Sequence, residues 1–272
     1  KVIQTHWRAI VPRISFGLVT AILFFSALTA NAQLANKVIS ANDIAVPSYI
    51  SRGIENDRRP EEEKARDANR KPGKVMAFFG VKPGDNVSEL LTFGGYYTGV
   101  LSEIVGETGV VYGQNNDWIM KRQEDGKSPI EKRIAEQGLK NVVDLVSELE
   151  DPKLPRGEMD AVFIVLIYHD AMGGFNTDTD AMNRAVYDSL KPGGIYGVIE
   201  HHAAPGMGLL DLTKNHRTER HLVVEDILKA GFELAGETDL LENLSDPLDV
   251  SVFSPTIRGK THRFVLKFRK PS

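Results

Sequence analysis

The stretch Val87-Ser-Glu-Leu-Leu-Thr-Phe-Gly-Gly-Tyr-Tyr-Thr98 decides the fold, because it reads as a strand, a glycine-bearing turn and the start of a helix. A strand that passes through such a turn into a helix presents free backbone N–H groups to a bound cofactor. Glu89, near the carboxyl end of the strand, is placed to accept hydrogen bonds from a ligand or a neighbouring loop. The turn keeps the pair Gly94-Gly95, but Leu91 and Phe93 stand where small residues are expected.

Strands and helices alternate along the chain from about residue 72 to its end, which predicts a mostly parallel sheet with helices on both faces. The predicted strands are Asn86 to Leu91, Val110 to Gln114, Val142 to Val146, Ala161 to Ile167, Ile195 to Glu200, Glu233 to Asp239 and Arg263 to Phe268. The predicted helices are Pro72 to Phe79, Tyr97 to Val105, Ile130 to Gln137, Thr179 to Ser189 and Val223 to Ala230.

The first 32 residues have the features of a secretory signal peptide. Lys1, Arg8 and Arg13 precede an apolar run of about 17 residues, Ile14 to Ala30, and Ala30-Asn-Ala32 offers small residues to a signal peptidase. We expect cleavage after Ala32 and a periplasmic or secreted protein. The run is at the short limit of a membrane span, so an uncleaved anchor is the alternative.

Residues 33–71 are polar and charge-rich with little apolar periodicity, which indicates an arm packed over a single domain, residues 72–272. The chain has 33 basic and 37 acidic residues, and loss of residues 1–32 leaves 30 against 37. This acidic balance argues against a nucleic-acid partner, because phosphates require a basic surface.

The absence of cysteine excludes thiol nucleophiles and thiolate-bound metals, so any divalent metal must be bound by His, Asp or Glu. We therefore expect a small-molecule substrate and no stable membrane span after signal cleavage. The oligomeric state stays open, with a homo-oligomer as one option.

Two junctions indicate a family. Leu190-Lys-Pro-Gly-Gly-Ile195 joins a helix to a strand, and Ala230-Gly-Phe-Glu-Leu234 leads from the last helix into the end of the sheet. Over residues 72–271 the chain resembles the class I S-adenosylmethionine-dependent methyltransferases. The resemblance implies an α/β, Rossmann-like sheet of seven mostly parallel strands with helices on both faces and an antiparallel last strand.

Five further motifs resemble a bacterial group of predicted exported methyltransferases. They are Glu89-Leu with Gly94-Gly-Tyr-Tyr-Thr98, Tyr168-His-Asp170, His201-His-Ala203, His216-Arg217 and Arg258-Gly-Lys-Thr261.

The same resemblance implies a site for S-adenosylmethionine. In the superfamily an acidic residue and a Gly-x-Gly-x-Gly loop follow the first strand, and a second acidic residue after the next strand binds the ribose. Here an amide stands where the ribose carboxylate belongs, and an amide lacks charge-assisted strength. The residues implied for the cofactor are Glu89, Gly94, Gly95, Tyr96, Gln114, Asn115 and Glu148.

Residues suited to acid–base chemistry follow two central strands. Tyr168-His169-Asp170 comes after the fourth predicted strand, where His169 is a candidate general base with Asp170 to orient it. The alternative is that Asp170 caps the next loop and His169 bonds to the backbone. His201 and His202 end the fifth strand and His216 lies beyond it, so the candidate catalytic residues are Tyr168, His169, Asp170, His201, His202 and His216.

The same histidines allow a metal site, since borderline metals such as zinc, iron and manganese favour imidazole with carboxylate. The candidate ligands are His169, His201 and His216. Because neighbouring strand residues point to opposite faces, we expect only one of His201 and His202 to face the crevice.

Three functions remain open from the sequence. The first is methyl transfer from S-adenosylmethionine to a small molecule. The second is a methyltransferase fold adapted as a lyase, hydrolase or isomerase that uses the His/Asp cluster, with or without a metal. The third is a non-catalytic small-molecule binding protein.

Overall fold

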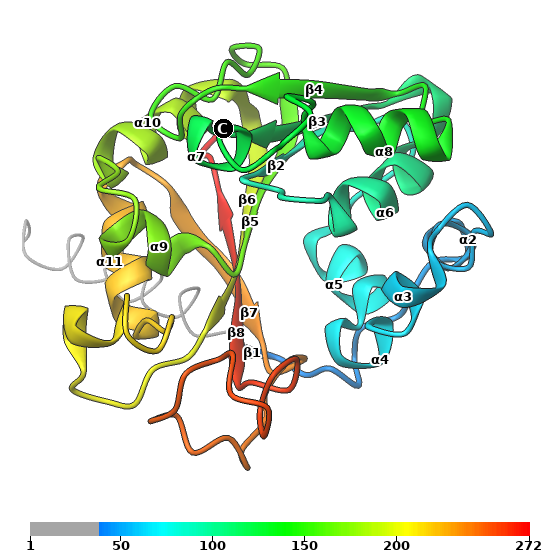
Figure 1. Cartoon of the computed structure of the whole chain (residues 1–272). Helices are drawn as coiled ribbons and strands as arrows, with labels where there is room; N and C mark the ends of the chain where they lie inside the picture. Colours follow the sequence, from blue (N-terminus) through cyan, green and yellow to red (C-terminus); the bar gives the residue numbers. More distant parts are fainter. Residues whose placement is uncertain (1–37) are drawn as a thin grey trace, which may run out of the picture.

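The computed structural model describes residues 38–272, so the predicted signal peptide and its cleavage site lie outside the described residues. Eight strands form one sheet in the order β1-β7-β8-β6-β5-β2-β3-β4 (Figure 1). Their bounds are β1 Val38–Ile39, β2 Asn86–Leu90, β3 Val110–Asn115, β4 Val142–Val146, β5 Met159–Val165, β6 Leu190–His201, β7 Glu233–Thr238 and β8 Arg263–Arg269.

The sheet has the predicted Rossmann-like architecture of the methyltransferase fold, with one additional strand. β8 pairs antiparallel with both β6 and β7, whereas the other pairs are parallel. The prediction of seven strands is wrong by one, because Val38–Ile39 in the arm adds to the edge beside β7. This strand has only two residues, too short to be recognised from alternation of apolar residues.

Helices cover both faces of the sheet (Figure 1). The arm and one face carry α2 Ser48–Ile54, α3 Glu61–Lys64, α4 Asp67–Arg70, α5 Pro72–Phe79, α6 Tyr96–Val105 and α8 Pro129–Gln137. The other face carries α9 Tyr168–Gly173, α10 Thr179–Ser189 and α11 Arg220–Lys229, and the short α7 Asp117–Met120 follows β3. Single 3-10 turns occur at Gly106–Thr108 and Gly208–Asp211.

Local signals explain where these helices begin and end. Pro72 opens α5, and Gly80 closes it in a left-handed conformation with φ 84°. The Asp178 side chain accepts the backbone N–H of Ala181 at the start of α10.

Two strand boundaries at the centre of the sheet differ from those predicted. β5 ends at Val165 because Leu166 has φ 60°, and Tyr168 to Asp170 form the first turn of α9 instead of the end of a strand. β6 begins at Leu190, so the Lys-Pro-Gly-Gly segment belongs to the strand.

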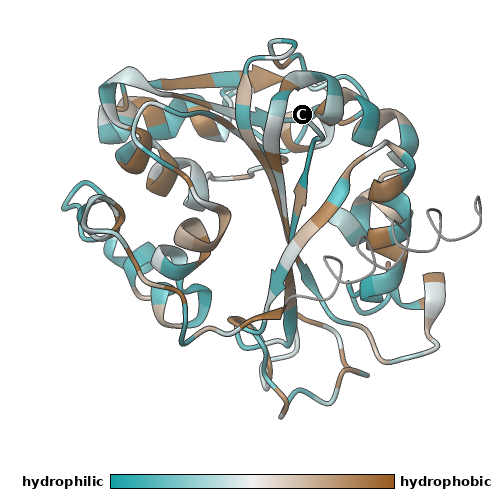
Figure 2. Ribbon diagram, turned by 180° about the vertical axis from the view of Figure 1, so that it is seen from behind, coloured by the Kyte–Doolittle hydropathy of each residue, from teal (hydrophilic) through white to brown (hydrophobic). Residues whose placement is uncertain are grey.

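Apolar side chains on alternate strand positions form two cores, one on each face of the sheet. On β5, Phe163 packs with α5 and α6, whereas Val162 and Ile164 pack with α10 and α11. Figure 2 shows these apolar central strands between helices whose outer sides are hydrophilic.

The described part of the arm, residues 38–71, packs against α5 and α6 and reaches the glycine-bearing turn after β2. Glu63 forms a buried ion pair with Arg133 of α8, whose Nε donates to the Gly94 carbonyl at 2.5 Å. Asp67 accepts the Tyr96 hydroxyl at 2.5 Å and pairs with Arg59 at 2.8 Å. The arm therefore packs beside the turn after β2, at the carboxyl edge of the sheet. Within residues 38–272, no helix has the length and apolar character that a membrane span needs.

Candidate functional site

The turn after β2 keeps the backbone shape of a glycine-rich loop although two of its residues are large. Leu91, Phe93 and Gly95 all have left-handed backbone angles, with φ of 44°, 52° and 72°. Only glycine adopts this conformation freely, and a residue with a Cβ loses about 1–2 kcal/mol there. The turn is thus held in place by its surroundings rather than by its own sequence.

Two buried amides at the end of β3 hold this turn. Gln114 Oε1 accepts the Leu91 N–H at 2.9 Å, and its Nε2 donates to the Ser147 carbonyl at 2.5 Å. Asn115 contacts the Phe93 backbone twice, accepting its N–H at 2.9 Å and donating to its carbonyl at 3.0 Å. Both side chains are fully buried. From the sequence, one of these amides was predicted to contact the ribose of the cofactor. In the structure, both amides form hydrogen bonds with protein backbone.

Glu89 accepts hydrogen bonds from the first turn of α6. Its Oε2 accepts the Thr98 N–H at 2.7 Å and the hydroxyls of Thr98 and Thr92 at 2.7 and 2.6 Å. The carboxyl group is buried, and desolvation raises its pKa despite these hydrogen bonds. Glu89 therefore joins the strand to the helix and brings a potential negative charge to the turn.

The other residues proposed for the cofactor are placed as follows. Gly94 is exposed, and a Cβ on it would meet no atom within 4 Å. A Cβ on Gly95 would approach Ile130 to 2.7 Å, so this position requires glycine. Tyr96 faces the arm, with the guanidinium carbons of Arg66 and Arg70 4.8 and 4.6 Å from its ring centre.

Glu148 is exposed, and its carboxylate accepts the Asp117 N–H at 3.2 Å. Beside it, Trp118 lies edge-on to Phe93 and to Phe175, with ring centres 6.3 and 5.4 Å apart. Phe93 and Trp118 are 38% and 39% exposed, so this aromatic cluster presents open surface next to the turn.

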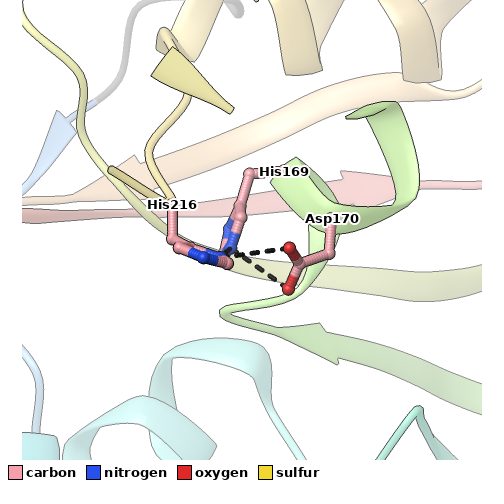
Figure 3. Close-up of side chains that lie close together, drawn as sticks. All are labelled: His169, Asp170 and His216. Atoms are coloured by element: carbon pink, nitrogen blue, oxygen red, sulfur yellow. Dashed lines mark hydrogen bonds and ion pairs between the residues drawn. The ribbon is translucent and has the colours of Figure 1, made fainter. Parts of the chain in front are cut away.

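His169, Asp170 and His216 form a compact group at the carboxyl ends of β5 and β6 (Figure 3). His169 and Asp170 open α9, and His216 comes from the loop before α11. His169 Nε2 lies 3.2 Å from His216 Nδ1 and 3.3 Å from Asp170 Oδ2, and His216 Nδ1 lies 3.1 Å from Asp170 Oδ1. The three side chains therefore meet at one point.

A fourth residue, Glu200, anchors this group from inside the protein. Its carboxylate is fully buried and lies 2.9 Å from His169 Nδ1, an ion-pair distance without the alignment of a hydrogen bond. The same carboxylate accepts the backbone N–H groups of His169 at 3.2 Å and His201 at 2.5 Å. Burial lowers the pKa of His169, but Glu200 and Asp170 outweigh it and raise that pKa to about 10.

His201 and His202 point to opposite sides of β6. The His201 ring is 6.1 Å from the His169 ring, and its Nδ1 is 2.7 Å from Thr261 Oγ1. Part of its surface is exposed, yet desolvation and then the charge of His169 hold its pKa well below the usual value. His202 packs against His262 and Phe264, away from the group.

Tyr168 also points away from the crevice. It is fully buried, donates to Asp226 Oδ2 at 2.7 Å and accepts Asn183 Nδ2 at 2.7 Å. Of the residues proposed for catalysis, the structure brings together His169, Asp170 and His216, with His201 beside them.

Arg263 is a buried cation at the start of β8 that was not among the residues predicted for the site. It is 6% exposed and opposite His201 in the sheet, and it donates to the carbonyls of Asn69 and Thr261 at 2.6 and 3.2 Å. Among residues 38–272 no carboxylate pairs with it. Burial lowers its pKa to about 10, Tyr97 opposes this effect, and the positive charge of Arg70 adds to it. Arg70 is therefore close enough for its charge to act on Arg263.

A comparison with protein-family profiles finds no match, and a sequence comparison with curated proteins finds none either. Solved structures do share the fold. A S-adenosylmethionine-dependent methyltransferase from Aquifex aeolicus is 21% identical with a TM-score of 0.56, covering 78% of this chain and 98% of its own.

Two further structures are similar at comparable scores. A Bacillus halodurans protein proposed to be a methyltransferase is 17% identical (TM-score 0.53; 75% of this chain, 100% of its own). The [4+2]-cyclase SpnF is 18% identical (TM-score 0.53; 80% of this chain, 86% of its own). At these identities the comparisons establish the methyltransferase fold alone.

The environment of Glu89 predicts a pH-dependent effect on stability. A raised pKa means that the folded protein binds more protons than the unfolded chain above about pH 4.5, the usual value for glutamate. The Glu89 contribution to stability is therefore lost as pH rises through the folded-state pKa. Glu89→Gln keeps an oxygen for the three hydrogen bonds and removes the charge. The stability of the mutant relative to the wild type should therefore increase as the pH rises.

Urea unfolding between pH 4 and 8 measures this difference, and the exposed Glu107→Gln controls for the loss of one charge. A difference between wild type and Glu89→Gln that stays constant over this range would contradict the prediction.

Proposed function

We propose that this protein is an enzyme that transfers a methyl group from S-adenosylmethionine to a small anionic molecule. The methyltransferase fold and the left-handed turn after β2 support the proposal most directly. In folds of this type ligands bind in the crevice at the carboxyl ends of the strands. Both the turn and the histidine group lie along that edge.

The residues at the turn fit the cofactor in part. The turn would hold the methionine end through its backbone, beside Glu89 and the open Gly94, and Trp118 offers aromatic surface to the adenine. Gln114 or Asn115 stands in place of the ribose carboxylate, and both already bind protein backbone, so we expect weaker binding than a carboxylate would give. When bound, S-adenosylmethionine supplies an electrophilic methyl group.

The acceptor would be held by cations on the other side of the crevice. Arg263 is buried without a carboxylate partner among the described residues, and burying a lone guanidinium is costly. A carboxylate or phosphate on the substrate would offset that cost. His201, neutral because of its lowered pKa, can share a hydrogen bond without adding charge.

The nucleophilic atom of the acceptor would face the group of His169, Asp170 and His216. The His216 side chain is 29% exposed and that of His169 only 3%, so His216 is the imidazole within reach of a substrate. Asp170 orients His216 through the 3.1 Å contact at Nδ1. Catalysis then comes from proximity, orientation and loss of the acceptor proton at this group.

A second candidate is a reaction that needs no adenosyl cofactor, such as a lyase, hydrolase or isomerase step at the same histidines. The engagement of Gln114 and Asn115 with protein backbone favours it. SpnF, named for a cyclisation, has the same fold, and a fold does not fix a reaction.

We also propose that the protein is exported to the periplasm and belongs with the predicted exported methyltransferases. The apolar run before Ala32 supports export. Expression of the full chain in a bacterium, followed by fractionation and N-terminal sequencing, should give periplasmic protein that begins at Gln33. Recovery of uncleaved protein in the membrane fraction would support the anchor instead.

Calorimetric titration with S-adenosylmethionine tests the cofactor. The wild type should bind with a dissociation constant of about 1–100 µM, roughly −8 to −5.5 kcal/mol. Phe93→Gly should bind several-fold more tightly, because it relieves the left-handed strain and lets the ligand approach the backbone. Phe93→Ala is the matched control, since it removes the ring and keeps the strain.

Glu89→Ala should abolish binding. No heat from either the wild type or Phe93→Gly at millimolar ligand would reject the methyl donor and favour the second candidate. Binding without turnover of any acceptor would favour a non-catalytic binding protein.

Thermal unfolding with small anions tests the acceptor class. At constant ionic strength, malonate or inorganic phosphate should raise the melting temperature of the wild type, and the more effective of the two identifies the anionic group. Arg263→Met should lose this response and melt within about 4 °C of the wild type, because it removes an unpaired buried charge. Arg258→Met, at an exposed arginine, should respond like the wild type, and an equal response from Arg263→Met would exclude the site.

A further inference from the structure

We propose that His169 Nε2, His216 Nδ1 and an Asp170 carboxylate oxygen bind a divalent metal ion of the borderline class, such as zinc or cobalt. The proposal goes beyond methyl transfer and does not depend on it. It rests on four observations: the spacing of the three atoms, the protons they can share, the residue behind them and their access to the crevice.

The spacing matches a metal coordination sphere. His169 Nε2 and His216 Nδ1 are 3.2 Å apart, and Asp170 places Oδ2 3.3 Å from the first nitrogen and Oδ1 3.1 Å from the second. One ligand atom from each of the three residues lies within 4.8 Å of the other two. Zinc bonds to nitrogen and oxygen of about 2.0–2.1 Å in a tetrahedron place neighbouring ligand atoms about 3.3 Å apart. A metal therefore fits between the two nitrogens and a carboxylate oxygen once the Asp170 carboxylate turns one oxygen toward both nitrogens.

When Asp170 is a carboxylate, protons on the two imidazoles do not satisfy all three contacts. If His169 and His216 both donate to Asp170, two N–H groups face each other at 3.2 Å. If His169 donates to His216, the bare His216 nitrogen faces a carboxylate oxygen at 3.1 Å. Either choice leaves one repulsive contact, whereas a cation accepts a lone pair from all three atoms at once.

Glu200 stands where a metal-binding histidine needs a partner. Histidine ligands usually donate their second ring N–H to a carboxylate or carbonyl, which orients the ring. His169 Nδ1 lies 2.9 Å from the fully buried Glu200 carboxylate, and Nε2 then points at the other two ligands. With a divalent ion, the charges of Asp170 and Glu200 are balanced.

The site is open on one side. The side chains of His216 and Asp170 are 29% and 16% exposed, so a fourth position faces the crevice. Such an open position characterises catalytic rather than structural zinc sites, where it holds water or a substrate oxygen. Two imidazoles make magnesium or calcium poor occupants, because both prefer oxygen ligands.

His201, predicted from the sequence as a metal ligand, lies outside this group. Its Nδ1 contacts Thr261 and its ring centre is 6.1 Å from that of His169. Asp170 takes its place as the third ligand.

Metal titration of the purified protein tests the site. After removal of metals with a chelator, the wild type should bind one Zn²⁺ per chain by calorimetry, and Co²⁺ should give the strong visible absorption of a tetrahedral site. His216→Ala and Asp170→Asn should weaken binding at least 100-fold. Glu200→Gln should weaken it about 10–100-fold, because it acts through His169.

The exposed His221→Ala is the control and should bind like the wild type. Circular dichroism confirms that each variant is folded, and His216→Asn replaces any His216→Ala protein that is not. Zinc binding that is not stoichiometric, or that survives both His216→Asn and Asp170→Asn, would overturn the proposal. S-adenosylmethionine is absent from these titrations, so their failure is independent of the cofactor result.

Discussion

The buried carboxylate of Glu200 is the interaction on which the chemical side of this protein depends. A carboxylate without access to water needs several partners, and Glu200 takes the His169 ring and the backbone N–H groups of His169 and His201. These contacts fix the first turn of α9 against the end of β6. Asp170 and His216 are positioned as a consequence, because both contact the ring that Glu200 holds.

The crevice has two halves with different character. Around the turn after β2, buried amides stand where a carboxylate is expected and large side chains stand where glycines are expected. The amide groups form hydrogen bonds with the protein backbone. Around β6 and β8, Arg263 has no carboxylate partner among the described residues, and one side of His216 is open. The arm joins the halves, since it bonds to Tyr96 through Asp67 and to Arg263 through Asn69.

Much of the sheet could be predicted from the sequence, and less of the site. A strand such as Val142–Val146 has a strong local pattern of apolar, β-branched residues, and its bounds agree with the prediction. Strand ends also placed His169, Asp170 and His201 on one edge. The spatial partners did not follow, because the contacts of Glu63 with Arg133 and of Asn115 with Phe93 join distant segments and leave no periodic signal. The use of Asp170 rather than His201 beside His216 depends on loop geometry, which spacing along the chain does not encode.

The left-handed conformation of Leu91 and Phe93 has an evolutionary consequence. The backbone already follows the path of a glycine-rich loop, with Gln114 and Asn115 as its scaffold. Replacement of either residue by glycine needs no change of path, so loss or recovery of ligand contact at this loop is a matter of one or two codons. Related proteins can therefore change between a loop with glycine and a loop with large residues at these positions, while the fold and the histidine group stay intact.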